Sequence, residues 1–383
     1  MFTRRLTWIA AACAGIAAGA GAQAAPIVYH AVDLQALSTN PSDSSGQAIS
    51  GNGLTAGNSW SAADSQYHAV RNTGGAGPQD LGALGGPGYG SSAYGINNGG
   101  TAVGGSSYPR ADQNMFATHA VIFDGNTVKD IGAVNGDYSS YGFGINNLGQ
   151  ATGWASNYFD GFGGMRTGAF FYDGSTLHDL GTLGGDYATG RAINDAGTIA
   201  GYSKNSNGQQ RAFVTQGQQL IDIGTFGGAT SYAFGINSQG DVVGGATVAS
   251  SMEHAFVYRN GQLMDIGFLP GDVRSEARDI NDKGWVVGLS GGSANHGFLF
   301  DGTVMHDLAS LIGSGFDGWT ILDITGINDT GQIVGTAIRD NAVHAFRFDL
   351  VQNDGTVPEP STWLLVALGL AGLTLSRSRR AVS

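Results

Sequence analysis

The sequence predicts an all-β protein: a seven-bladed β-propeller of four-stranded repeats, closed by pairing of its N- and C-terminal strands. Three observations predict this fold. A twelve-residue pattern, GINSQGDVVGGA at 235–246, recurs in seven versions, a second block containing a hairpin turn alternates with it, and the two series are out of phase with the chain ends. Repetition of one unit favours a single repeat domain over two or three unrelated domains.

The pattern recurs at a nearly constant spacing. Its isoleucine stands at Ile49, Ile96, Ile145, Ile193, Ile236, Ile280 and Ile327. The intervals of 43 to 49 residues match the roughly 36 to 48 residues that four strands and their connections need. Such a unit most naturally forms a propeller blade. A β-solenoid is the alternative, although its rungs are usually shorter and do not need two hairpin tips per repeat.

Each repeat carries two hairpin signals. In the pattern, Asn237 can bond the turn backbone through its side chain, while Gly240 takes the left-handed position of a type I turn with a bulge. In the second block, best seen at 254–272, side chains alternate between two faces and Asn260-Gly261 suits a type I′ turn. Two hairpins make a four-stranded unit.

The ends of the chain predict how the ring closes. An aspartate on the return strand recurs at Asp33, Asp80, Asp130, Asp179, Asp222, Asp265 and Asp307, whereas the opening position of the preceding strand recurs at His68, His119, Gly168, Arg211, His254, His296 and His344. The chain therefore begins on a return strand, near 27–37, and ends on an opening strand, 344–350. These two strands are expected to pair in one shared blade, leaving no open sheet edge.

The N-terminus reads as a signal peptide over residues 1–24. Arg4 and Arg5 precede an apolar run, and Ala22-Gln23-Ala24 supplies a small-residue cleavage site. The only cysteine, Cys13, lies in this segment. The body, 25–350, is therefore expected to have no disulfide, no cysteine metal ligand and no cysteine nucleophile.

A linker at 351–356 leads to a C-terminal segment, 357–383, with three features in order. Pro358, Glu359 and Pro360 come first, an apolar run over 363–375 follows, and the chain ends with Arg377, Arg379 and Arg380. An apolar helix of 13 residues would be about 20 Å long, shorter than the roughly 30 Å hydrocarbon core. The membrane association of this short transmembrane span is therefore expected to be transient, with the arginines on the cytoplasmic side.

This C-terminal segment resembles the PEP-CTERM sorting signal of Gram-negative bacteria. The resemblance implies recognition by an exosortase and delivery to the cell surface or to an exopolysaccharide matrix. An accidental Pro-Glu-Pro before an ordinary tail anchor is the alternative, and whether the segment is cleaved or retained stays open.

The body resembles the HAF-repeat family of exported bacterial proteins over nearly all of 30–350. His-Ala-Phe stands at 254–256 and 344–346. That family is defined by its repeat and its location, so the resemblance supports the fold more than a function. The motif departs from the family at Gly168 and Arg211, and a metal ring of repeat histidines is therefore not expected.

Composition and repetition argue against most chemistry. Outside the two terminal segments the chain has 13 basic and 29 acidic residues, so a nucleic-acid partner is not expected. The recurring histidines and aspartates are expected to bond neighbouring strands and turns. The sequence contains no Ser-His-Asp order, zinc spacing, EF-hand loop or phosphate-binding loop, and we expect no metal, no cofactor and no catalysis. Weak Ca²⁺ binding at Gly-Asp turns stays open.

Residues that break the repeat are the candidates for function. We single out an aromatic insertion at 157–166, a second insertion at 108–116 and a stretch of mixed charge at 272–278, all expected as loops. In the first, Tyr158, Phe159 and Phe162 could stack on a sugar ring while Asp160 binds its hydroxyls. Packing of these rings on their own blade is the alternative.

Three functions fit the sequence. We favour a noncatalytic, monomeric surface or matrix protein that binds polysaccharide or other proteins in a biofilm. A secreted glycosidase or lyase is the first alternative, and it needs a carboxylate pair in the central pit about 5 to 9.5 Å apart. A purely structural coat component is the second.

Overall fold

The computed structural model describes residues 27–39, 43–73, 77–109, 116–133, 139–158, 165–292 and 294–351. Residues 28–351 form one compact unit. Within the described ranges the chain folds into strands β1 to β29 and one short helix, α1 (Leu308–Leu311), which confirms the all-β prediction. The predicted signal peptide, nearly all of the linker and the sorting segment lie outside the described residues.

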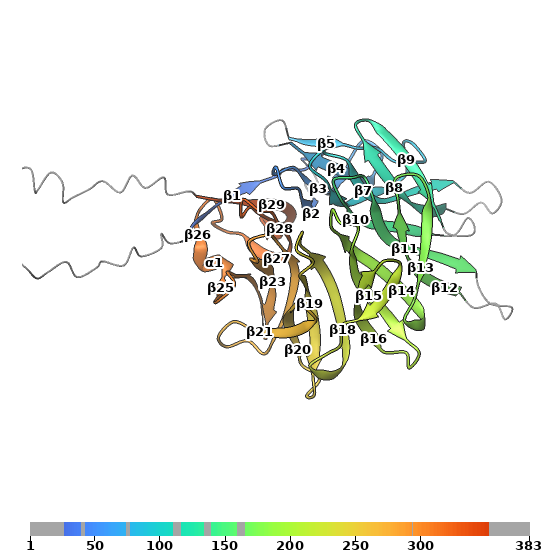
Figure 1. The fold of residues 1–383 in the computed structure, drawn as a ribbon. Coiled ribbons are helices and arrows are strands. Elements are labelled where there is room, and N and C mark those ends of the chain that lie inside the picture. The colour runs from blue at the N-terminus through green and yellow to red at the C-terminus, as the bar shows by residue number, and fades with distance from the viewer. Residues whose placement is uncertain are drawn as a thin grey trace, which may run out of the picture. The chain divides into compact units, whose positions relative to one another are not determined.

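Strands β2 to β25 form six antiparallel four-stranded repeats of one design (Figure 1). Each repeat has two hairpins, as the turn signals predict. The strands are, in repeat 1, β2 (Ser44–Ile49), β3 (Thr55–Ser61), β4 (Gln66–Asn72) and β5 (Pro78–Asp80); in repeat 2, β6 (Ser91–Ile96), β7 (Ala102–Pro109), β8 (Phe116–Asp124) and β9 (Thr127–Gly132); in repeat 3, β10 (Ser140–Ile145), β11 (Ala151–Tyr158), β12 (Met165–Tyr172) and β13 (Leu177–Gly181); in repeat 4, β14 (Gly184–Ile193), β15 (Ile199–Asn205), β16 (Gln210–Gln216) and β17 (Gln219–Asp222); in repeat 5, β18 (Gly227–Ile236), β19 (Val242–Val248), β20 (Glu253–Arg259) and β21 (Gln262–Gly267); and in repeat 6, β22 (Arg274–Ile280), β23 (Val286–Gly291), β24 (Asn295–Phe300) and β25 (Met305–Asp307). A parallel bridge between Thr167 and Tyr187 joins repeats 3 and 4 into one eight-stranded sheet.

Repeat 7 is assembled from both ends of the compact unit. It contains β27 (Thr320–Ile327), β28 (Ile333–Arg339), β29 (Ala342–Leu350) and β1 (Tyr29–Asp33), with the short β26 (Ile312–Ser314) on the outer side of β1. Strand β1 runs antiparallel to β29 from the Tyr29–Leu350 pair to the Asp33–Phe346 pair. The predicted pairing of the first and last strands is therefore present.

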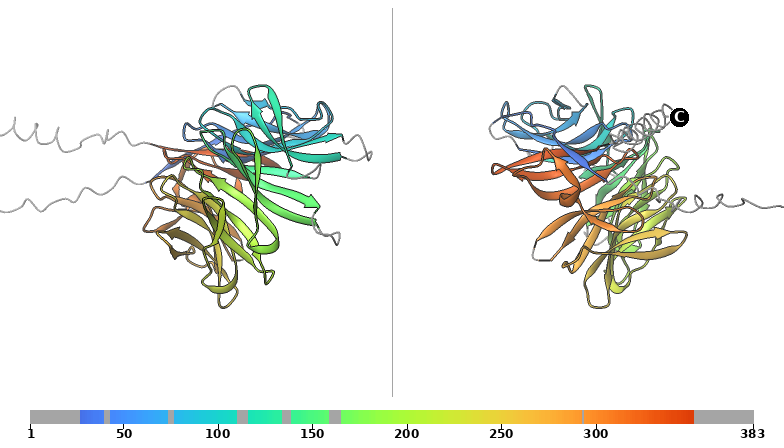
Figure 2. Two further views of the ribbon diagram at one scale, coloured as in Figure 1. Left: turned by 45° about the vertical axis from the view of Figure 1, so that its right-hand side comes forward. Right: turned by 90° about the vertical axis from the view of Figure 1, so that its left-hand side faces the viewer.

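The repeats follow one another around a common centre, from blue through green and yellow to red (Figures 1 and 2). Hydrogen bonds between turns link each repeat to the next: the side-chain amide of the asparagine that follows the recurring isoleucine donates to the backbone carbonyl of the following repeat's turn. The links are Asn97 to Asn146 (3.1 Å), Asn146 to Asn194 (3.0 Å), Asn194 to Asn237 (3.0 Å), Asn237 to Asn281 (3.3 Å), Asn281 to Asn328 (2.9 Å) and Asn328 to Ser50 (3.1 Å), and Asn52 supplies the remaining link to Asn98 (2.9 Å).

The turn itself forms as predicted. The Asn237 side-chain oxygen accepts from Asp241 N–H at 2.9 Å, and Gly240 has a φ of +84°, in the left-handed region that favours glycine. The side-chain oxygen of Asn237 thus accepts a hydrogen bond within its own turn, and its side-chain nitrogen donates one to the turn of the next repeat. Sequence reasoning found only the first of these roles.

A phenylalanine on the third strand anchors the core of five repeats. Its side chain is fully buried at Phe170, Phe213, Phe256, Phe298 and Phe346. The ring lies over a glycine of the second strand; a Cβ added at Gly335, for example, would lie 2.7 Å from the Phe346 ring. The same glycine lets the first strand approach closely, because that Cβ would also lie 2.3 Å from the Asp323 carbonyl oxygen.

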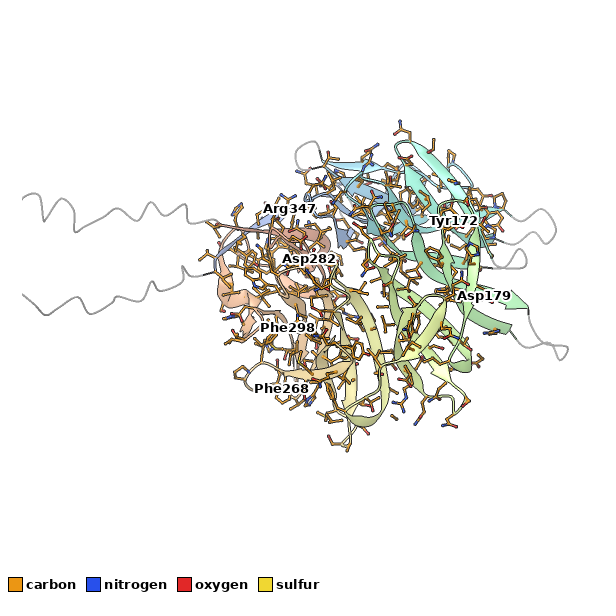
Figure 3. The ribbon with its side chains drawn as sticks, in the orientation of Figure 1. Tyr172, Asp179, Phe268, Asp282, Phe298 and Arg347 are labelled. Carbon is orange, nitrogen blue, oxygen red and sulfur yellow. The ribbon has the colours of Figure 1, made fainter. Side chains whose placement is uncertain are left out.

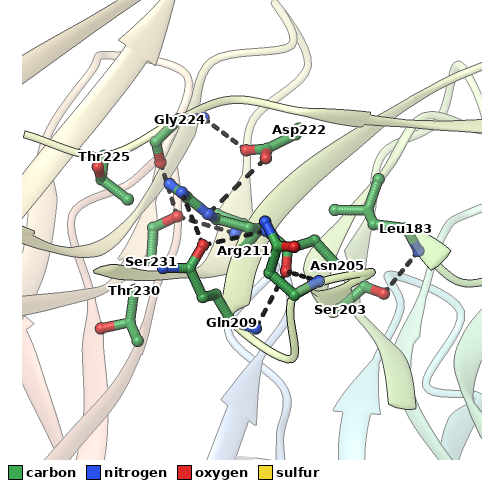
Figure 4. A network of polar contacts seen from close by, with 12 residues as sticks. Leu183, Ser203, Asn205, Gln209, Arg211, Asp222, Gly224, Thr225, Thr230 and Ser231 are labelled. Atoms are coloured by element: carbon green, nitrogen blue, oxygen red, sulfur yellow. Dashed lines mark hydrogen bonds and ion pairs between the residues drawn. The ribbon is translucent and has the colours of Figure 1, made fainter. Parts of the chain in front are cut away.

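The recurring histidine is held by the recurring aspartate. The Nδ1 atom of His68 lies 2.7 Å from Asp80 Oδ2, and that of His254 lies 2.7 Å from Asp265 Oδ2. Each such aspartate also accepts the N–H two residues later, as Asp265 does from Gly267 at 2.8 Å. In repeat 4, Arg211 takes the histidine position and its Nε lies 3.9 Å from Asp222 Oδ2 (Figure 4). These contacts confirm the structural role predicted for both residue types.

Repeat 6 departs from this scheme. Asp307 is the N-cap of α1 and accepts from Ala309 N–H at 2.9 Å. His296 contacts Asp272 instead, 3.1 Å away. The short helix was not predicted, because its four residues carry no helical periodicity.

Candidate functional site

A central cavity of about 310 Å³ opens among the turns that follow the recurring isoleucine, and residues of all seven repeats line it. The first strand of each repeat lies on the inside and contributes its last residues. The side chains that distinguish one repeat from another stand two residues before the recurring isoleucine, at Gln47, Tyr94, Phe143, Arg191, Phe234, Arg278 and Thr325. We call these seven residues the inner ring.

The inner ring breaks the symmetry of the repeats. Repeats 2 and 3 contribute aromatic side chains, and aromatic side chains and arginines alternate from repeat 3 to repeat 6, each in contact with the next. The Tyr94 and Phe143 ring centroids are 5.2 Å apart, and the Arg191 Cζ lies 4.1 Å from the Phe143 centroid and 5.7 Å from that of Phe234. Arg278 continues the band at 5.0 Å from the Phe234 centroid. Cation–π attraction holds both arginines against the rings.

The two arginines have different electrostatic settings. Arg278 forms ion pairs with Glu276 at 3.2 Å and with Asp323 at 3.5 Å. The Arg191 guanidinium has no ion pair among the residues that the structure describes. Burial lowers the pKa of Arg191, and the nearby phenol of Tyr202 opposes this shift.

A second cavity, of about 160 Å³, shares Arg278 with the first and is lined by Glu253, Arg274 and Glu276. Burial raises the pKa of Glu253 to about 7, and the charge of Glu276 adds to the shift. Burial likewise raises the pKa of Glu276 and of Asp323, against the lowering effect of Arg278. The buried Glu253 Oε1 has no hydrogen-bond partner, so this group favours its protonated form.

Glu253 predicts a change of stability with pH. Its pKa is about 7 in the folded protein against 4.5 in the unfolded chain. Between these pH values the folded protein keeps a proton on Glu253 that the unfolded chain has lost. The contribution of protonated Glu253 to the free energy of unfolding is therefore complete below pH 4.5 and is lost as pH rises through 7. We expect Glu253→Gln to raise the free energy of unfolding at pH 8 by about 2 kcal/mol and to change it little at pH 4.

Urea unfolding across this pH range measures the effect. Asp340→Asn is the matched control, because the Asp340 side chain is 90% exposed, and its pH profile should follow that of the wild type. Parallel profiles for Glu253→Gln and the wild type would contradict the assignment.

Aspartates at the cavity mouth link adjacent turns. Asp195 Oδ1 accepts from Asn147 N–H at 2.8 Å, Asp282 Oδ1 from Ser238 N–H at 2.9 Å, and Asp329 Oδ1 from Asp282 N–H at 2.8 Å (Asp282 is labelled in Figure 3). Across the described ranges no group of three or more His, Cys, Asp or Glu residues is placed to hold a metal ion. In the same ranges no helix is long and apolar enough to cross a membrane, and the predicted span at 363–375 lies outside them.

The predicted sugar-binding loop falls mainly outside the described residues. This holds for Phe159, Asp160 and Phe162, while Tyr158 ends β11 with its backbone paired to Met165. The sorting residues Pro358, Glu359, Pro360, Arg377, Arg379 and Arg380 also lie outside.

The mixed-charge stretch at 272–278 was expected as a loop, and this is wrong from Arg274 onward. Those residues begin β22, whose alternating side chains direct Ser275 and Ala277 to buried positions and leave Arg274, Glu276 and Arg278 at the second cavity. The rest of the inner ring was missed. Superposing the repeats on their isoleucine would have shown it, because five of the seven residues two positions before that isoleucine are aromatic residues or arginines.

Comparison with known proteins identifies the C-terminus. Residues 356–380 match the PEP-CTERM protein-sorting motif. The chain is therefore an exported cell-surface protein with a sorting signal that an exosortase recognises. No curated protein shows significant sequence similarity to the chain.

Solved structures show distant likeness. A puromycin-hydrolyzing peptidase of Mycobacterium tuberculosis has a TM-score of 0.49 and 9% identity, with 82% of this chain and 53% of the peptidase covered. A gluconolactonase of Xanthomonas campestris has a TM-score of 0.34 and 12% identity, with 86% and 99% covered. A Trypanosoma rangeli sialidase has a TM-score of 0.36 and 7% identity, with 86% and 55% covered. The chain thus spans about half the length of the peptidase and of the sialidase.

Proposed function

We propose that the chain is a seven-bladed propeller, displayed at the surface of a Gram-negative bacterium, that binds a saccharide of the exopolysaccharide matrix in its central cavity without turnover. The observation that carries this proposal is the inner ring. In six of the seven turns the recurring isoleucine is followed by an asparagine, yet the side chains two residues before the isoleucine differ, and five of them form a continuous aromatic and cationic band. A scaffold alone has no need of this departure.

Seven four-stranded repeats and the links between their turns support the propeller. Repeat 7 contacts repeat 1 through Asn328, whose amide donates to the Ser50 carbonyl oxygen at 3.1 Å, and β1 completes its sheet. A ring closed in this way has no free sheet edge between its first and last repeats. The chain then needs no partner subunit to complete its fold, which agrees with a monomer.

The chemistry of the inner ring suits a sugar. Tyr94, Phe143 and Phe234 offer ring faces against which the C–H face of a pyranose can stack, and the tyrosine adds a hydroxyl. The cavity volume of about 310 Å³ lies at the lower end of the roughly 300 to 1,000 Å³ of ligand pockets, so it suits a short saccharide.

A glycan-binding screen of the purified full chain tests the proposal. We expect at least one glycan to bind, Phe234→Ala to weaken that binding at least tenfold, and Phe268→Ala to leave it unchanged. Phe268 is the matched control because it is 38% exposed and outside the cavity (Figure 3). Absence of binding across the panel, or equal effects of the two variants, would contradict the proposal.

A secreted carbohydrate-active enzyme is the second candidate. The observation that favours it is the neighbouring pair Glu253 and Glu276 beside Arg278 in the second cavity, because a protonated and an ionised carboxyl group together can act as acid and base. Release of reducing or unsaturated ends from polysaccharide, lost in Glu253→Gln and Glu276→Gln, would support it. No release by the wild-type chain would eliminate it.

A further inference from the structure

We infer that the central cavity selects acidic sugars, and that Arg191 binds the carboxylate of a uronic acid residue. This inference rests on the proposed saccharide binding and names the class of saccharide. It starts from a difference between Arg191 and every other arginine that the structure describes.

Each of those other arginines has a side-chain partner. Arg259, Arg278, Arg339 and Arg347 pair with carboxylates, Arg211 lies near Asp222, and Arg71, Arg166 and Arg274 donate to carbonyl, hydroxyl or amide oxygens. Within the described ranges the Arg191 guanidinium alone has neither a hydrogen bond nor an ion pair. Its contacts are with aromatic rings, which use none of its five N–H donors.

Holding a guanidinium in a cavity without an anion opposes folding. Removal from water weakens the hydration of the charge, and cation–π contacts recover only part of that loss. A planar guanidinium with unused donors matches the two oxygens of a carboxylate and can bind them with two parallel hydrogen bonds. An anionic ligand would therefore replace the missing partner.

The surroundings of Arg191 indicate a sugar carboxylate. Phe143 and Phe234 flank it at 4.1 and 5.7 Å from their centroids, and the Tyr94 ring lies 5.2 Å from that of Phe143. A uronic acid presents both parts that this arrangement recognises: an apolar ring face and a carboxylate at its edge. The aspartates at the mouth already accept backbone N–H groups, and Arg278 is already paired. Arg191 is thus the cation left for the ligand.

Matched acids and esters separate charge from shape. Disaccharides of glucuronic, galacturonic, mannuronic and guluronic acid, each with its methyl ester, are titrated into the purified full chain by calorimetry. For at least one pair we expect the acid to bind at least tenfold more tightly than the ester. Arg191→Gln should weaken binding of the acid at least tenfold and of the ester less than twofold. The control, Arg339→Gln, removes a charge at the tip of the hairpin between β28 and β29 and should change neither.

The outcomes distinguish this inference from the proposed function. Equal affinity for acid and ester in every pair, with neutral glycans still bound, overturns the acidic selectivity and leaves saccharide binding intact. Failure of every acid, ester and neutral glycan to bind overturns both.

Arg191→Met keeps the long side chain between the rings and removes the charge, so a folding defect can be separated from a binding defect. It should melt at the wild-type temperature or above it, because the unpaired charge opposes folding, and it should lose the preference for acids. A lower melting temperature with the preference for acids retained would overturn the role given to Arg191.

Discussion

Phe298→Ala should destabilise the protein by about 3 to 5 kcal/mol, the usual loss for a large aromatic side chain in a well-packed core. Phe298 is fully buried on β24 and is labelled in Figure 3. It packs in one cluster with Val243, Ala255 and Val257 of repeat 5 and with Ala277, Ile280 and Val286 of repeat 6. The ring therefore joins two adjacent repeats, and a cavity there weakens both.

Urea unfolding of Phe298→Ala beside Phe268→Ala measures this effect. Phe268 is 38% exposed and Phe298 fully buried, so truncation of Phe268 removes less buried area and should cost clearly less than truncation of Phe298. Similar losses for the two variants would show that the core is not organised around the phenylalanine of the third strand.

Deletion of residues 28–34 should destabilise the protein more than Phe298→Ala does and prevent stable folding. The segment contains β1, which lies between β26 and β29 in the sheet of repeat 7. It also carries Tyr29, fully buried, and Leu34, which packs with Val334 and Ala345. Without it β29 becomes an open edge and this core is exposed, conditions that favour aggregation. Size-exclusion chromatography and far-UV circular dichroism report the outcome.

A circular permutant is the control for this deletion. The Val351 N–H donates to the Val28 carbonyl oxygen at 2.8 Å, so a short loop can join residue 351 to residue 28. New ends can be placed at the exposed turn near Asn207 and Gly208. The permutant keeps the β1–β29 pairing without the natural ends and should fold as a monomer. A deletion variant that remained folded and monomeric would contradict the closing role of β1.

Local sequence signals predicted the repeat because its turns are specified by neighbouring residues. Gly240 adopts a positive φ, and Asn237 bonds the N–H four residues later. Pairing of β1 with β29 followed from counting, since the two series of strand positions are out of phase. The histidine–aspartate contacts followed from their recurrence, which favoured a structural role.

Side chains in the cavity escaped prediction because their meaning depends on residues far away in the chain. Arg191 lies against Phe143 and Phe234, each more than 40 residues distant. Likewise Arg278 meets Asp323, 45 positions later. In the sequence each of these cavity residues is one charged or aromatic residue among many, whereas the insertion at 157–166 visibly interrupts the repeat.

The sequence by itself determined that the chain is exported, repetitive and built of hairpins, because a sorting motif and a glycine turn are each specified by a few neighbouring residues. Only the tertiary structure decided where a ligand could bind. The residues two positions before each recurring isoleucine line one cavity only in the folded chain. Among the arginines that the structure describes, Arg191 in this cavity is the one without a hydrogen bond or an ion pair. The asparagine after the recurring isoleucine links adjacent turns in six repeats, and the residue two positions before that isoleucine determines the chemistry of the cavity.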